Sequence, residues 1–111
     1  EALHYIEGIT FMEEVEFSKS NRWLTTMTVD NKKLALNRDQ IIKALNDNDI
    51  ESRPVWKPMH MQPLYKKSEY VMSESGDTSK ILFETGLCLP SGSNLKDEEQ
   101  DRIINIIHSL L

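Results

Sequence analysis

The sequence lacks the features that mark membrane proteins, disulfide-bonded secreted proteins and nucleic-acid binders. None of its apolar runs approaches the roughly 18 residues that a membrane-spanning helix requires. Its 111 residues include one cysteine, Cys88, which excludes an internal disulfide and is typical of a reducing cytosol. The 18 acidic residues outnumber the 13 basic ones, and the net charge of −5 argues against a nucleic-acid partner. We therefore expect a cytoplasmic protein that binds neither a membrane nor a nucleic acid.

The short motifs that identify many catalytic and metal sites are also missing. There is no phosphate-binding loop, no zinc-ligand spacing and no nucleophile elbow. The three histidines, His4, His60 and His108, are too far apart along the chain to indicate a metal site, so no metal is expected. His108 falls in the last turn of a predicted helix and is expected at the surface. Cys88 lies in the apolar run LCLP and is expected to be a small buried core residue.

The sequence predicts four short strands. Apolar residues at every second position favour strands over Ile9–Phe17 and Trp23–Val29. A third strand is predicted over Ile50–Trp56, where Pro54 favours an edge position because proline cannot donate a ladder hydrogen bond. The run Leu87–Pro90 is predicted to be a short buried strand.

Capping patterns predict three helices between and after these strands. Asn37 followed by Gln40 forms a capping-box pattern, and the sequence NDND ends that helix. A second helix is predicted from Asp77 or Thr78 to Gly86, and a third from Asp97, with acidic residues at its positive end. The order of elements predicts an α/β fold of the two-layer (α+β) kind, in which helices cover a small sheet.

The stretch ESRPVWKPMHMQPLYK, residues 51–66, combines prolines, cations and an aromatic residue. Prolines fix the backbone and restrict the residues before them, so this loop is expected to be preorganised. Arg53 and Lys57 offer charge, Trp56 a flat wall and His60 a hydrogen-bonding ring, a set that can bind an anion or a polar ring. The alternative is that Trp56 and the prolines cover the core while the cations are solvated, and composition alone favours this alternative slightly.

A second loop, LPSGSNL over residues 89–95, combines small polar residues with a glycine. Such a loop at the end of a strand can direct backbone N–H groups toward a ligand. Ser91 and Ser93 are its candidate polar side chains. The same composition is also typical of an ordinary turn.

Three segments together resemble a known enzyme family. NRWLTTMTVD, IESRPVWKPMHMQPLYK and LFETGLCLPSGSNLKDEEQDRIINII are similar to the C-terminal part of the DegT–DnrJ–StrS family of pyridoxal-phosphate-dependent sugar aminotransferases. The similarity is greatest to the branch that makes amino sugars for pilin, capsule or other surface glycans. It extends over roughly Tyr5 to Leu111.

The resemblance implies the small C-terminal domain of a fold-type-I aminotransferase. Such enzymes transfer an amino group, generally from glutamate, to a keto sugar carried on a nucleotide diphosphate. Their cofactor is pyridoxal 5'-phosphate, which acts as an electron sink. They are typically homodimers with the active sites at the subunit interface.

The family's cofactor-binding lysine and most of its phosphate-binding groups lie upstream of the part that this sequence resembles. Residues 1–111 are therefore expected to be one domain cut from a longer protein, without a catalytic residue and inactive alone. The opening EALHYIEG, which is typical of the tail of a helix followed by glycine, suits that interpretation. The resemblance also places Arg53, Trp56, Lys57 and His60 in a substrate-binding loop, and Ser91 and Ser93 in a loop that supports it.

Two other classes of function remain open from the residues alone. The chain could be a stand-alone module that binds an anion or a peptide through the loop from Arg53 to Gln62, without catalysis. It could also be an oligomerisation domain that uses the strand with Pro54 or the isoleucine-rich C-terminal helix as its interface.

Overall fold

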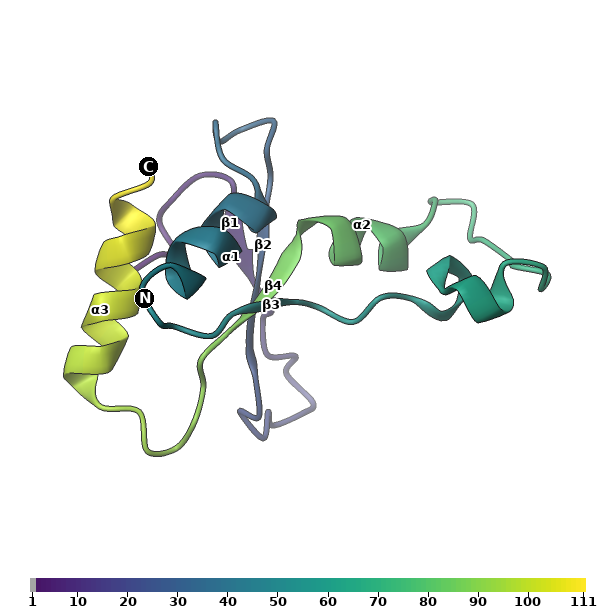
Figure 1. Cartoon of the computed structure of the whole chain (residues 1–111). Helices are drawn as coiled ribbons and strands as arrows, with labels where there is room; N and C mark the ends of the chain where they lie inside the picture. The colour runs from purple at the N-terminus through teal and green to yellow at the C-terminus, as the bar shows by residue number, and fades with distance from the viewer. Residues whose placement is uncertain (1) are drawn as a thin grey trace.

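A computed structural model describes residues 2–111 of the chain (Figure 1). These residues form one small sheet, three α-helices and two 3-10 turns. In chain order the elements are β1 (Ile9–Phe11), β2 (Thr25–Val29), α1 (Arg38–Asn46), β3 (Arg53–Pro54), η1 (Met59–Met61), η2 (Pro63–Tyr65), α2 (Thr78–Thr85), β4 (Gly86–Leu89) and α3 (Asp97–His108). The order matches the predicted succession of strands and helices, and the predicted α+β class is confirmed.

The four strands pair in the order β1-β2-β4-β3, and every pair is antiparallel. The last strand in sequence, β4, therefore lies in the interior of the sheet. Its Leu87 faces Met27 of β2 on one side and Pro54 of β3 on the other. Pro54 lies on an edge strand, as predicted, where its missing N–H breaks no ladder.

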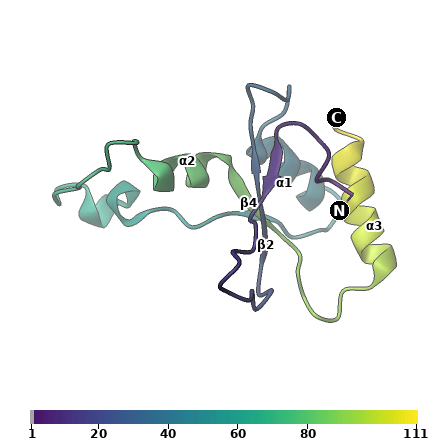
Figure 2. The ribbon, with the colours of Figure 1, turned by 180° about the vertical axis from the view of Figure 1, so that it is seen from behind.

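The hydrophobic core lies between the sheet and the helices α1 and α3. These two helices lie side by side on the same side of the sheet, as Figures 1 and 2 show from opposite directions. The core consists of side chains contributed by strands, helices and the segments that connect them: Leu3, Ile9, Met27, Val29, Leu36, Ile41, Leu45, Ile50, Leu87, Leu89, Ile103 and Ile107. Burial of these groups is the main stabilising contribution to the fold.

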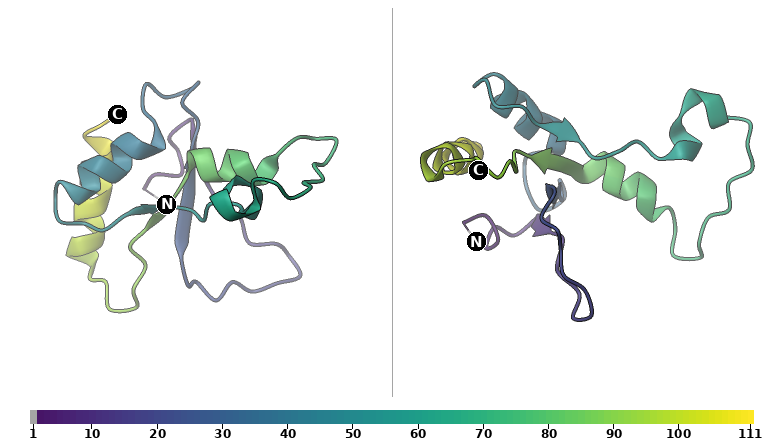
Figure 3. Two further views of the ribbon diagram at one scale, coloured as in Figure 1. Left: turned by 45° about the vertical axis from the view of Figure 1, so that its right-hand side comes forward. Right: turned by 90° about the horizontal axis from the view of Figure 1, so that it is seen from below.

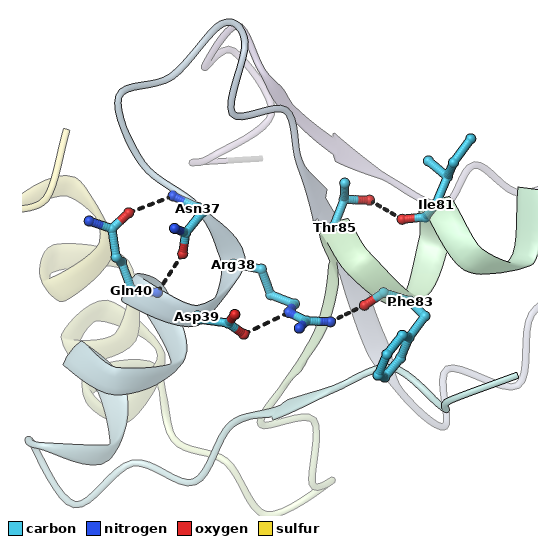
Figure 4. Close-up of polar contacts among 7 residues, drawn as sticks. All are labelled: Asn37, Arg38, Asp39, Gln40, Ile81, Phe83 and Thr85. Carbon is cyan, nitrogen blue, oxygen red and sulfur yellow. Dashed lines mark hydrogen bonds and ion pairs between the residues drawn. The ribbon is translucent and has the colours of Figure 1, made fainter. Parts of the chain in front are cut away.

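Helix α2 and the segment before it project away from this core. We call residues 55–77 the arm. It leaves the sheet after β3 and passes through η1 and η2. It then runs back to the start of α2, beside the part of the arm that leads away from the sheet (Figure 3). Arg38 of α1 ties the base of this projection to the core. Its guanidinium donates to the carbonyl of Phe83 in α2, pairs with Asp39 at 2.9 Å and lies 5.1 Å from the centroid of the Phe83 ring (Figure 4).

Local capping signals fix the ends of the helices. The predicted capping box is confirmed: the backbone N–H of Gln40 donates to the Asn37 side chain at 3.0 Å, and the Gln40 side chain accepts from Asn37 N–H at 2.8 Å (Figure 4). Asp77 caps α2, and the helix gives way to β4 at Gly86. A Cβ at Gly86 would lie 2.5 Å from the Leu82 carbonyl oxygen, so only glycine fits there.

The predicted strand lengths and the predicted burial of Cys88 need correction. The strands predicted over Ile9–Phe17 and Ile50–Trp56 are shorter, because only the residues that face a partner strand form ladder hydrogen bonds. Trp23 likewise lies before the start of β2. Cys88 is only half-buried, since it faces an open cleft rather than the core. His108 is exposed, as predicted.

The helix tail predicted at the start of the chain is also not observed among the residues that the structure describes. Glu1 lies outside the described residues, and residues 2–8 form turns. Among residues 2–111, no helix has both the length and the apolar character needed to cross a membrane.

The interior position of β4 generates a prediction about stability. Leu87 is 0% exposed and packs at the centre of the core, so Leu87→Ala should lower the free energy of unfolding by about 2–5 kcal/mol. Leu82→Ala is the matched control, because Leu82 is 48% exposed and its truncation should cost less than about 1 kcal/mol. Urea unfolding followed by circular dichroism measures both; equal losses would contradict this account of the core.

Candidate functional site

An open cleft of about 910 Å³ lies along β3 and the end of β4. Its walls come from segments that are distant in sequence: the residues before β2, the whole of β3 with its flanks, the loop after β4 and the first half of α3. The lining residues are Trp23, Leu24, Asp49, Ile50, Glu51, Ser52, Arg53, Pro54, Val55, Trp56, Lys57, Cys88, Leu89, Pro90, Ser91, Gly92, Leu95, Glu99, Arg102 and Ile103.

Three of the residues predicted for a binding site line this cleft together. Arg53 lies in β3 opposite Cys88, and Trp56 and Lys57 follow in the extended segment behind it. The Arg53 guanidinium is exposed and pairs with Glu51, which lies two residues before it along the chain. An exposed ion pair of this kind contributes about 0–1 kcal/mol. The guanidinium can therefore exchange Glu51 for an anionic ligand at little cost.

The two tryptophans of the sequence meet at one rim of the cleft. The ring centroids of Trp23 and Trp56 lie 6.1 Å apart, with the planes tilted by 37°. The residues are 70% and 67% exposed, so both rings present open faces to the solvent. Exposed aromatic faces beside cations are suited to stacking with a planar ring such as a nucleobase. Sequence reasoning singled out Trp56 but missed Trp23, which joins the site only through tertiary structure.

Ser52 attaches β3, which forms one wall of the cleft, to the interior strand β4. This buried residue donates its hydroxyl to the carbonyl of Cys88 at 2.9 Å, and its backbone N–H donates to the Asn46 side chain at 3.2 Å. These bonds fix β3 against β4 and against the end of α1. Burial raises the pKa of the Cys88 thiol, which keeps it protonated and disfavours a role as a nucleophile.

The second predicted loop contributes one of its two serines. Ser91 lines the cleft, and its hydroxyl donates to the carbonyl of Trp23 at 3.0 Å. Ser91 thus holds the Trp23 segment, which in turn meets Trp56 of the first loop. Ser93 is exposed and does not line the cleft.

Charges of both signs surround the cleft. Arg102 from α3 adds a cation that sequence reasoning missed, and its guanidinium donates to the carbonyl of Asn48 at 2.5 Å. On sequence alone Arg102 is one charge on the polar face of a helix, and no local signal marks it. Acidic groups from Glu51 and Glu99 offset part of this positive charge.

The structure places His60 outside the cleft, on the arm. Its ring stacks on Tyr70, with centroids 3.8 Å apart and planes at 11°. Its Nε2 lies 2.8 Å from the carboxylate of Asp77, the capping residue of α2. The predicted substrate-binding set is therefore divided: Arg53, Trp56 and Lys57 line the cleft, whereas His60 lies further out on the arm.

The carboxyl group of Asp77 has a strongly shifted pKa. Burial of the side chain raises the pKa, but other contacts outweigh this effect: hydrogen bonds from Lys80 N–H and from the hydroxyls of Ser79 and Tyr70, and the nearby His60. Together they lower the pKa from 3.8 to about 2. Asp77 is thus an anion at any pH above about 4, where it can pair with the imidazole beside it.

No lysine in residues 2–111 is suited to attach a cofactor. A lysine that forms a Schiff base is held in a desolvated site, whereas every lysine of this chain is exposed. The described residues therefore do not fit the covalent attachment of pyridoxal phosphate.

The hydroxyl of Ser91 generates a prediction about the geometry of the cleft. Ser91→Ala removes the hydrogen bond to the Trp23 carbonyl, so the tryptophan pair should lose its fixed arrangement. The near-ultraviolet circular dichroism of tryptophan reads this directly, because Trp23 and Trp56 are the only tryptophans. Ser93→Ala is the matched control and should leave the spectrum unchanged. An unaltered spectrum for Ser91→Ala would show that this bond does not hold the pair.

The lowered pKa of Asp77 generates a prediction about pH. A group whose pKa is lower in the folded state stabilises that state above its ordinary pKa and loses this effect as the pH falls through the folded value. The free energy of unfolding of wild type should therefore exceed that of Asp77→Asn at pH 5, and the difference should disappear between pH 3.8 and about 2. Urea unfolding across this range measures it. A difference that is independent of pH would contradict the role of the ionised carboxylate.

Comparison with known proteins identifies the family. A sequence model of the DegT/DnrJ/EryC1/StrS aminotransferase family matches residues 1–108. EpsN of Bacillus subtilis (strain 168), whose name assigns it to the pyridoxal phosphate-dependent aminotransferases, is 43% identical over 107 residues. That alignment covers 96% of this chain and 27% of EpsN. The GDP-perosamine synthase of Caulobacter vibrioides is 33% identical over 89 residues, which are 80% of this chain and 23% of that protein.

A solved structure agrees with the sequence matches. The DegT DnrJ EryC1 StrS aminotransferase from Brucella abortus is 26% identical and superposes with a TM-score of 0.76 over 97% of this chain and 27% of that one. The chain thus spans about a quarter of the length of the relatives it matches. Since the family match extends over nearly all of the sequence, the chain belongs to the DegT/DnrJ/EryC1/StrS aminotransferase family.

Proposed function

We propose that the chain is the C-terminal domain of a pyridoxal-phosphate-dependent sugar aminotransferase. The complete enzyme would transfer an amino group from glutamate to a keto sugar linked to a nucleotide diphosphate. Family membership supports the aminotransferase activity, and the name of the GDP-perosamine synthase supports a nucleotide-linked sugar as the substrate class. The role of the product in surface glycans is part of the same proposal.

The observation that carries the proposal is the placement of Arg53 beside the tryptophan pair. A nucleotide diphosphate sugar presents a flat base and two phosphates, and the cleft offers aromatic faces and an exposed guanidinium. Arginine suits phosphate because its planar fork donates two parallel hydrogen bonds. In the proposed complex Arg53 and Lys57 bind phosphate or carboxylate, and Trp56 with Trp23 forms the wall against which a ring stacks.

The remaining part of the protein would supply the chemistry that these residues do not. Pyridoxal phosphate, when bound, supplies an electron sink for amino-group transfer. Since no lysine of residues 2–111 suits its attachment, we place the cofactor mainly on a large domain outside this chain, so that residues 1–111 alone would be inactive. We further propose that the full protein is a cytoplasmic homodimer, as the family resemblance implies.

Substitution of Arg53 in the complete protein tests the proposal. Arg53→Ala should lower kcat/KM for a GDP-linked keto sugar by roughly 10- to 100-fold, the loss expected for one charge-assisted hydrogen bond. Arg22→Ala is the matched control, since the Arg22 side chain is equally exposed, pairs with Glu14 and does not line the cleft. The readout is 2-oxoglutarate formed from glutamate. Equal activities of the two variants would place the substrate elsewhere.

Determination of the coding sequence upstream of Glu1 tests whether a separate large domain holds the cofactor. We expect a large domain there that carries a cofactor-binding lysine. An upstream sequence without such a domain would favour a stand-alone binding module. In that case the isolated chain should itself bind a nucleotide diphosphate, and Arg53→Ala should abolish that binding.

A further inference from the structure

The arm and helix α2 carry large apolar side chains that the rest of the described chain leaves open. No residue from Arg53 to Thr85 is buried, although this range includes η1, η2 and α2. A single exposed apolar residue is ordinary, whereas a group of them on one projecting segment indicates an interaction surface. Outside the cleft, the exposed side chains of this group include Met59, Leu64, Tyr70, Val71, Met72 and Ile81.

The conformation of helix α2 needs support that its own contacts do not supply. Isolated helices shorter than about 12 residues are marginal in water, and most helices are stabilised by burial of an apolar face. Helix α2 has 8 residues, and none of them is buried. The polar contacts of Arg38 and Asp77 hold its two ends but leave Ile81 57% exposed. A surface that covers the arm and α2 would supply the missing burial.

The charges of the arm favour a second copy of the chain as that surface. Residues 55–77 include three basic and three acidic residues, so the net charge of −5 lies entirely outside the arm. Two copies therefore repel one another least where their arms meet. The basic pair Lys66 and Lys67 is followed closely by the acidic residues Glu69 and Glu74. When two such segments run antiparallel across a two-fold axis, the basic residues of each can face the acidic residues of the other.

The position of the arm also suits contact between two copies. Both termini lie on the side of the molecule where α3 lies, and the arm projects in the opposite direction (Figures 1 and 2). A domain joined at either terminus would begin on the side away from the arm. The arms of two copies can therefore meet while their cores stay apart.

We propose that the arm and the exposed side of α2 form the surface through which two copies of the protein associate, arm against arm about a two-fold axis. The contact is isologous, which means that the same residues serve on both sides. Leu64 and Val71 are its apolar anchors, since they are the most exposed of these side chains, at 82% and 84%. The inference deepens the homodimer of the proposed function by naming its surface, and it requires neither the cofactor nor the aminotransferase activity.

Sedimentation equilibrium of the 111-residue chain tests the association. We expect a reversible dimer that does not grow into larger species, because an isologous contact closes on itself. Leu64→Asp combined with Val71→Asp should raise the dissociation constant of the dimer roughly 100-fold, since both changes place charge in an apolar contact. The matched control combines Met12→Asp with Phe17→Asp. These two side chains are 89% and 92% exposed and lie outside the arm, so the dissociation constant should not change.

Exchange of charges tests whether the two arms meet each other. Lys66→Glu with Lys67→Glu makes the arm negative, and Glu69→Lys with Glu74→Lys makes it positive. Each double variant alone should dimerise roughly 10-fold more weakly than wild type, because like charges then face each other. An equimolar mixture of the two should form a mixed dimer as tight as that of wild type. Circular dichroism of each variant should show the helix content of wild type.

Three outcomes would overturn the proposal. A wild-type chain that stays monomeric would assign the apolar surface of the arm to another part of a longer protein. A dimer that persists when Leu64 and Val71 carry the aspartate substitutions would place the contact elsewhere. A mixture that dimerises no better than its two components would show that the arms do not meet. A complete protein without aminotransferase activity would contradict the proposed function, whereas the sedimentation result would still decide this inference.

Discussion

Pairing of β4 with both β2 and β3 is the constraint on which the fold and the cleft depend. The last strand in sequence enters the sheet between two earlier ones, and this brings Cys88 beside Arg53. The Ser52 hydroxyl strengthens the same junction by its bond to the Cys88 carbonyl. Because β3 has only two ladder residues, it depends on β4 and on Ser52 for its position. Without β4, the segment around Arg53 would lose its place in the sheet.

The arm is held by polar contacts rather than by a core of its own. Arg38 connects α1 to the carbonyl and ring of Phe83, which fixes the base of α2. Asp77 gathers hydrogen bonds at the far end of the same helix and faces His60 across the arm. Apolar side chains around these contacts, such as Leu64 and Val71, remain exposed. The geometry of the arm thus depends on a few side chains, among them Asp77, which also begins α2.

Predictions from sequence succeeded where the signal is local. The start at Asn37 and the end at Gly86 follow from capping and from steric contact within one turn of helix, so a short stretch of sequence contains all the information needed. Strand lengths were overestimated over Ile9–Phe17 and Ile50–Trp56, because a strand pattern in the sequence marks residues that could pair but not which of them meet a partner. Cys88 was placed in the core for the same reason: an apolar run does not show which face of its strand stays open.

The sequence by itself determined the family, the order of elements and the residue types of the loop that contains Arg53, Trp56 and His60. Long ordered motifs carry that information, and the match to the aminotransferase family confirms it. Only the tertiary structure decided that Trp23 lies beside Trp56 at the cleft and that His60 lies outside the cleft, next to Asp77. The physical reason is that contacts between distant segments place these side chains, and no local pattern records which distant segments will meet.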